Sequence, residues 1–201
     1  MRLFVTGIGT EVGKTIASSI LVEALKADYW KPIQAGELDN SDTQKVKNLI
    51  SNATSIFHKE AYQLNSPMSP HAAAERDNTT ILLSKINAPK TDNHLIIEGA
   101  GGLLVPLNNQ ECILDIIPNL NAEVVIVSRH YLGSINHTLL TIQALKAKKI
   151  AIKGIIFSGN ENNDTESIIL KMSNIPMLFR INEEMEFNKE IIMNYAQQIK
   201  L

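Results

Sequence analysis

The chain has 201 residues, of which 44% are apolar and 20% are charged, and its formal net charge at neutral pH is -2. This length and apolar content suit one domain with a sizeable core, and the near-neutral charge gives no general attraction to nucleic acid or to an anionic membrane. The single cysteine, Cys112, excludes an intrachain disulfide and is typical of a protein in the reducing cytosol.

No apolar segment of the sequence has the length of a secretory signal or of a membrane-spanning helix, and the first predicted strand begins directly after residue 1. We therefore expect a cytoplasmic protein. Its expected partners are small molecules or protein, with no nucleic acid and no membrane.

Short β-rich runs alternate with segments of helical periodicity along the chain. The predicted strands are 2–6, 28–33, 94–99, 123–128 and 150–158, with a weaker one at 175–181. The predicted helices are 14–27, 41–51, 79–87, 134–148 and 183–201, and residues 159–167 are predicted to form a loop. Because several strands are apolar on both faces, the pattern indicates a single α/β domain over residues 1–201, with a mostly parallel sheet and helices on both faces.

The segment GIGTEVGKT, residues 7–15, joins the first strand to the first helix. Its glycines let backbone N–H groups converge on an anion, and the helix N-terminus adds positive potential. In such loops the lysine, here Lys14, contacts the β- and γ-phosphates, and the next hydroxyl, Thr15, binds Mg²⁺. Ile8 stands where the usual motif has its first glycine, so the loop is an atypical variant. The sequence thus predicts a P-loop NTPase fold that binds a nucleoside triphosphate.

Three charged residues are expected at the same edge of the sheet as this loop, which is where open α/β sheets bind ligands. Glu98 closes an apolar strand, Asp42 begins a predicted helix, and Lys31 follows a short strand. Carboxylates are suitable Mg²⁺ ligands. Two plainer interpretations stay open: Asp42 only caps its helix, and Lys31 is solvated surface.

The loop resembles the GTxxGKT signature of dethiobiotin synthetases, and five further segments are similar to that family's other blocks, in the same order. They are KPIQAG (31–36), NSDT (40–43), SPHAAAE (69–75), EGAGGLLVPL (98–107) and LGSINHTLLT (132–141). The resemblance covers residues 7–154. It implies ATP- and Mg²⁺-dependent closure of a cyclic urea from 7,8-diaminopelargonate and CO₂, a late step of biotin synthesis, by a homodimer.

The resemblance also implies roles for individual positions. Lys14 and Lys31 are expected to be catalytic, and Thr15, Asp42 and Glu98 to bind the metal. The implied nucleotide-binding residues are Thr10, Glu11, Val12, Gly13, Lys14, Thr15, Ile16, Asp42, Glu98, Gly99, Ala100 and Gly101. The implied substrate-binding residues are Lys31, Ala35, Gly101, Gly102 and Asn136, the last reaching the site of a second subunit. The glycines after Glu98 could instead form only a tight turn, and Asn136 could only cap a helix.

The chain departs from the family pattern at two places. Ala35 stands where many relatives have Ser or Thr, so a hydroxyl contact is missing or is replaced, for example by Gln34. Ser158 and Gly159 stand where an asparagine that reads adenine is expected, and the segment around Asn182 lacks an expected glycine and proline. We therefore expect weak discrimination between nucleobases.

Two other functions are compatible with a loop of this kind. A nucleotide-switched partition or positioning ATPase usually has an additional lysine early in the loop, which residues 7–10 lack. An amidotransferase acting on a corrin normally has a further domain.

Overall fold

The computed structural model describes residues 1–199, and its central element is a seven-stranded sheet with the order β4-β2-β6-β1-β7-β8-β9. Every strand pair is parallel. The strands are β1 (Arg2–Gly7), β2 (Asp28–Trp30), β4 (Phe57–His58), β6 (Leu95–Gly102), β7 (Glu123–Arg129), β8 (Ile152–Ser158) and β9 (Met177–Ile181). Two further strands, β3 (Ile33–Ala35) and β5 (Tyr62–Leu64), pair separately.

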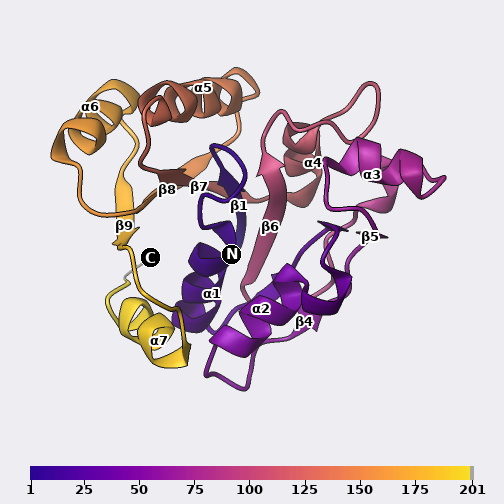
Figure 1. Cartoon of the computed structure of the whole chain (residues 1–201), viewed down its shortest axis with the longest axis horizontal. Coiled ribbons are helices and arrows are strands. Elements are labelled where there is room, and N and C mark those ends of the chain that lie inside the picture. Colours follow the sequence, from indigo (N-terminus) through magenta and orange to yellow (C-terminus); the bar gives the residue numbers. More distant parts are fainter. Residues whose placement is uncertain (200–201) are drawn as a thin grey trace.

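Helices cover both faces of the sheet (Figure 1). One face carries α1 (Lys14–Leu25), α2 (Asp42–Leu49) and α7 (Lys189–Gln197). The other side carries α3 (Pro70–Arg76), α4 (Ile113–Leu120), α5 (Ser134–Ala147) and α6 (Asn163–Ser173). Single 3₁₀ turns occur at Leu38–Asn40 and Leu83–Lys85. The predicted α/β class is therefore confirmed, while the assignment of residues 1–201 to one domain stays a prediction.

The central strands alternate between two apolar cores. In β1, Leu3 and Val5 pack with the layer of α1, whereas Phe4 packs with the opposite layer. Both faces are buried, so these strands are apolar at consecutive positions, as is usual for the central strands of parallel sheets.

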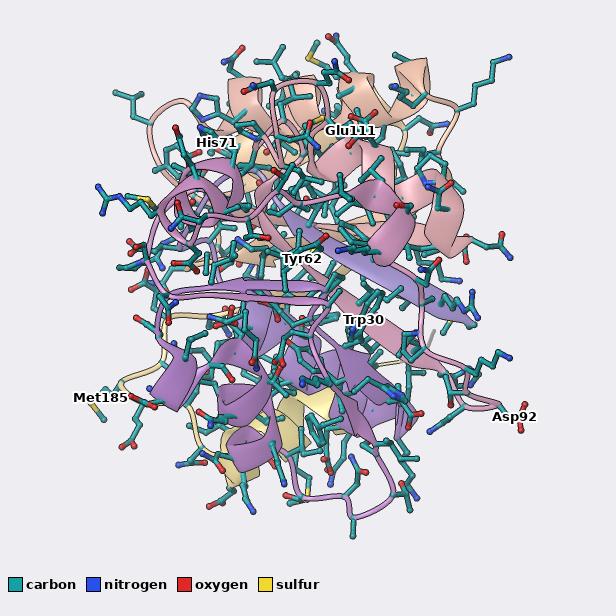
Figure 2. All side chains as sticks on the ribbon, turned by 90° about the vertical axis from the view of Figure 1, so that its right-hand side faces the viewer. Trp30, Tyr62, His71, Asp92, Glu111 and Met185 are labelled. Carbon is teal, nitrogen blue, oxygen red and sulfur yellow. The ribbon has the colours of Figure 1, made fainter. Side chains whose placement is uncertain are left out.

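The two ends of the parallel strands form two different edges of the molecule. Met185, in the segment after β9, and Asp92, in the turn before β6, lie on opposite sides in Figure 2. The segments that leave the carboxyl ends of the strands therefore gather on one edge. Within residues 1–199, no helix has the combination of length and apolar character needed to cross a bilayer.

Two of the predicted elements are wrong. Residues 28–33 form parts of two strands in different sheets, because the chain leaves β2 at Lys31 and Pro32, and proline has no N–H for a ladder. Residues 79–87 are not an α-helix and contain only the turn Leu83–Lys85.

Two other predicted elements have different bounds in the structure, and helix α4 is an added element. The final helix begins at Lys189 rather than at 183, and its predicted residues 200 and 201 lie outside the described residues. Helix α6 begins inside the predicted loop 159–167, because the Asn162 side chain accepts a hydrogen bond from the Thr165 N–H and caps it. Helix α4 was not predicted and contains Pro118.

Candidate functional site

A cavity of about 860 Å³ opens at the carboxyl edge of the sheet. Its walls come from the loop after β1, the start of α1, the segment from Lys31 to Asp42, β6, and the segments after β8 and β9. This volume lies within the range of small-molecule sites in proteins. The position is the one at which open α/β sheets bind ligands.

The loop between β1 and α1 has a shape that depends on glycine at two positions. A Cβ at Gly7 would lie 2.5 Å from Val12 Cγ2 and 2.7 Å from the Gly9 carbonyl oxygen, so a larger residue does not fit. Gly13 has a φ of 95° and directly precedes the first residue of α1. The first turn of α1 contains no acidic residue, so its positive potential is left for an anion.

Lys14 lies inside this loop and is 8% exposed. Its Nζ donates a hydrogen bond to the Gly9 carbonyl oxygen at 3.0 Å. Burial lowers the pKa of the Lys14 ammonium to about 8; the nearby Lys31 charge adds to this effect, while Glu98 and Asp42 partly offset it. No carboxylate of residues 1–199 forms an ion pair with Lys14. The lysine therefore carries a poorly compensated charge.

Lys31 lies between two carboxylates. Its Nζ donates to Asp42 Oδ2 at 2.5 Å and to Glu98 Oε1 at 3.1 Å. Burial alone would lower the pKa of Lys31, but the charges of Glu98 and Asp42 outweigh it and raise the pKa above its usual value. Burial likewise opposes ionisation of Asp42, yet the Lys31 ammonium lowers the pKa of that carboxyl. Lys31 and Asp42 are therefore both charged near neutral pH.

The oxygens of Thr15, Asp42 and Glu98 gather around the same position. Thr15 Oγ1 donates to Glu98 Oε1 at 3.0 Å, and both carboxylates contact the Lys31 ammonium. These hard oxygens are arranged around a cation, which suits Mg²⁺. Within residues 1–199 there is no group of three or more His, Cys, Asp or Glu side chains placed to hold a metal. The donor set thus fits an ion that takes its other ligands from phosphates and water, as Mg²⁺ usually does.

The start of α2 fixes the backbone of Asp42. Ser41 caps the helix, and Gln44 completes a capping box with it. Gln34 Oε1 accepts a hydrogen bond from the Asp42 N–H at 3.2 Å, and Gln34 Nε2 donates to the Gly36 carbonyl oxygen at 2.9 Å. Both ends of this amide are therefore engaged within the loop, and the replacement of the hydroxyl expected at Ala35 by Gln34 stays a prediction.

Most of the predicted site residues line the cavity. They are Thr10, Glu11, Gly13, Lys14, Thr15, Ile16, Lys31, Ala35, Asp42, Glu98, Ala100 and Gly101. Val12 is instead buried in the core beneath the loop. The Gly99 carbonyl oxygen lies 3.5 Å from Lys31 Nζ, and Gly102 pairs with Gly7 between neighbouring strands.

Asn136 does not lie at the cavity of its own chain. It is exposed on α5, in the first turn of that helix. Its predicted contact with substrate therefore requires a second subunit.

Sequence reasoning missed two groups beside the carboxylates of Asp42 and Glu98. Lys45 pairs with Glu37 and lies 3.8 Å from Asp42 Oδ1, a contact that its three-residue spacing from Asp42 could have indicated. Tyr29 donates its hydroxyl to Glu98 Oε2 at 3.0 Å. No sequence pattern signals this second contact, because it joins two strands far apart in the chain.

Ser158, Gly159 and Asn182 also line the cavity, together with Glu183, Glu184 and Phe187. The two acidic side chains already have partners. Glu183 accepts from Arg129 at 3.0 Å, and Glu184 accepts from the Tyr195 hydroxyl at 2.6 Å.

The chain is similar to known proteins over nearly its whole length. Residues 1–190 match the family model described as an AAA domain. The chain is 56% identical to an ATP-dependent dethiobiotin synthetase BioD of Christiangramia forsetii, over 98% of this chain and 95% of the relative. It is 48% identical to the protein of the same name from Cytophaga hutchinsonii, over 98% and 96% of the two chains. It is 43% identical to the protein of the same name from Chlamydia pneumoniae, over 99% of this chain and 89% of the relative.

Solved structures with a similar fold have little sequence in common with this chain. A ParA family ATPase from Chlorobium tepidum aligns with a TM-score of 0.58 at 14% identity, over 98% of this chain and 99% of the other. The septum site-determining protein MinD from Pyrococcus horikoshii aligns with a TM-score of 0.59 at 13% identity, over 98% and 96%. At these identities the likeness shows the fold alone.

Proposed function

Because the chain belongs to the family of ATP-dependent dethiobiotin synthetases, and is an ATP-dependent cyclo-ligase of biotin biosynthesis, we propose how its residues carry out the reaction. The substrates are 7,8-diaminopelargonate, CO₂ and ATP, and the reaction takes place in the cavity at the carboxyl edge of the sheet. The observation that supports this best is the position of Lys31 between Asp42 and Glu98, beside the loop that holds Lys14.

The reaction has three steps. One amine of the diamine combines with CO₂ to give a carbamate and releases a proton. A carbamate oxygen then takes the γ-phosphoryl group of ATP, which gives a mixed carbamic-phosphoric anhydride and ADP. The second amine attacks the carbamate carbon and loses a proton, phosphate leaves, and the cyclic urea is closed.

The protein contributes alignment and charge neutralisation in this scheme. Lys14 and the N-terminus of α1 bind the β- and γ-phosphates. The Lys31 ammonium stabilises the negative charge of the carbamate and of the transferring phosphoryl group. Neither role requires Lys14 or Lys31 to exchange a proton during the chemical steps.

Thr15, Asp42 and Glu98 would hold a magnesium ion, which neutralises charge on the phosphate oxygens when it is bound. Asp42 and Glu98 also bind Lys31, so the same two carboxylates position the ammonium and the metal. This sharing keeps both cations beside the transferring group.

We also propose that the protein is a homodimer in which Asn136 reaches the substrate of the partner. The support is a group of exposed apolar side chains on and before α5, the helix that carries Asn136. They are Tyr131, Leu132, Ile135 and Leu140, and Leu132 is fully exposed in the single chain. Sedimentation of the wild type and of Leu132→Asp tests this: a monomeric wild type would contradict it. The cytoplasmic location stays a prediction.

The decisive experiment for the function measures release of phosphate and formation of dethiobiotin. Both should require ATP, the diamine and bicarbonate together, and Lys14→Ala should abolish both while leaving the circular dichroism spectrum unchanged. ATP hydrolysis that does not respond to the diamine would instead favour a nucleotide-switched ATPase.

The metal ligands are tested separately. Glu98→Gln and Asp42→Asn should move the magnesium dependence of turnover to higher concentrations. An unchanged dependence in both variants would remove them as ligands.

A further inference from the structure

The two oxygens of the Glu98 carboxylate have different surroundings. Oε1 accepts hydrogen bonds from Thr15 Oγ1 at 3.0 Å and from Lys31 Nζ at 3.1 Å, and both donors line the cavity. Oε2 accepts from the Tyr29 hydroxyl at 3.0 Å, the one donor to this atom within residues 1–199. Tyr29 is not part of the cavity wall. One oxygen therefore lies on the side of the site, and the other on the side of the core.

Tyr29 is held rigidly. It is fully buried in β2, between β4 and β6, and pairs in register with Ile96 of β6. Its ring packs at 5.9 Å from the ring of Phe57. A tyrosine in such a place has no alternative position for its hydroxyl. The Tyr29 hydroxyl is the donor and the Glu98 carboxylate oxygen the acceptor of this hydrogen bond.

We propose that Tyr29 is a positioning residue that holds Glu98 by Oε2, so that Oε1 is presented to the magnesium ion. The inference rests on the proposed role of Glu98 as a metal ligand. Mg²⁺ demands near-ideal octahedral geometry, so the orientation of a ligating carboxylate affects affinity. Groups that hydrogen-bond to metal ligands commonly account for a factor of about 10 to 100 in metal affinity.

The experiment compares Tyr29→Phe with the wild type. This substitution removes one oxygen atom and keeps the ring. We expect the magnesium concentration that half-saturates ADP binding, measured by calorimetry, to rise about tenfold. ADP binding without magnesium should change by less than about twofold, since the phosphate loop is untouched. A stability loss with no change in the magnesium requirement would show that the hydroxyl is only structural, and would overturn the proposal.

Two controls make the result specific. Tyr62→Phe removes a hydroxyl that accepts the Leu82 N–H at 3.0 Å, away from Glu98, and should leave the magnesium requirement unchanged. An equal rise in Tyr62→Phe would contradict the proposal. If Tyr29→Phe does not fold, Phe57→Leu loosens the packing of the same ring and should raise the requirement in the same direction; no rise would overturn the proposal.

A double substitution shows whether Tyr29 acts through Glu98. In a Glu98→Gln background, Tyr29→Phe should have no further effect on the magnesium requirement, and an additive effect would contradict the coupling. The single variant Glu98→Gln separates the two hypotheses. If it leaves the requirement unchanged, the proposed metal ligand is wrong. If it raises the requirement and Tyr29→Phe does not, only the positioning role is wrong.

Discussion

Nucleotide binding should be linked to uptake of a proton by Lys14. Burial lowers the pKa of this ammonium to about 8 in the free protein, whereas a phosphate group beside it would favour the charged form. At pH 7 and below most of the ammonium is already present, and affinity should depend little on pH. Above pH 8 the lysine must gain a proton on binding, and the affinity should fall as the pH rises.

The magnitude follows from the pKa. With a pKa of about 8, about one tenth of the molecules carry the ammonium at pH 9, so the Kd for ADP should be about tenfold higher there than at pH 7. That is about 1.4 kcal/mol of binding free energy. Proton uptake should rise from about 0.1 per ADP at pH 7 to about 0.5 at pH 8. The phosphates of ADP, with a second pKa of about 6, are mainly ionised in this range.

Calorimetry in buffers of different ionisation enthalpy measures both quantities. Lys14→Arg should bind without proton uptake, because a guanidinium stays protonated. Lys47→Ala, an exposed lysine on α2, should behave as the wild type. Lys31 should not contribute, since its neighbours raise its pKa. An ADP affinity that is constant from pH 7 to pH 9.5 would refute the reasoning.

Three further outcomes are expected. Lys31→Ala should lower kcat by about 100-fold or more while changing the nucleotide Kd much less, and a defect confined to nucleotide binding would contradict its role at the transferring group. Since Ser158 and Gly159 replace the expected adenine-reading residue, GTP or CTP should support turnover within about tenfold of ATP in competition assays; a thousandfold preference for ATP would contradict this. Asp28→Asn should lower the free energy of unfolding at pH 7 by about 2 kcal/mol, because the buried Asp28 carboxylate accepts several hydrogen bonds. Burial opposes ionisation of Asp28, but the hydrogen bonds outweigh it and lower the pKa of the carboxyl. The stability difference between wild type and Asp28→Asn should therefore be present above about pH 4 and should shrink as the pH falls through the folded-state pKa. Urea unfolding that gives an equal difference at pH 7 and pH 3 would contradict this.

The parts of the site that are continuous in sequence could be predicted. The loop 7–15 carries its glycines, lysine and threonine within one strand-to-helix connection, so the start of α1 at Lys14 follows from local rules. The α/β class can also be predicted from local patterns, because β-rich runs alternate with segments of helical periodicity along the chain. The segment 79–87 was misassigned because Ile81 and Ile86 are buried apolar residues in an irregular segment, and burial without regular structure resembles helical periodicity.

The contacts that depend on strand order could not be predicted. Sequence alone does not show that β2 lies beside β6, which is what places Tyr29 and Lys31 next to Glu98. These positions are set by tertiary pairing of segments more than 60 residues apart, for which local propensity carries no information.

The charge balance of the site explains how it can be assembled before a ligand arrives and still attract a phosphate. Two lysines and two carboxylates meet at one edge of the sheet, so the group as a whole is close to neutral and its burial is tolerable. The ion pairs within this group are unevenly distributed, however, because Lys31 forms an ion pair with both Asp42 and Glu98. Lys14 is left with a carbonyl oxygen as its partner, and its lowered pKa is the consequence. An incoming phosphate supplies the missing negative charge at Lys14, so the same arrangement that pairs Asp42 and Glu98 with Lys31 also favours binding of the nucleotide.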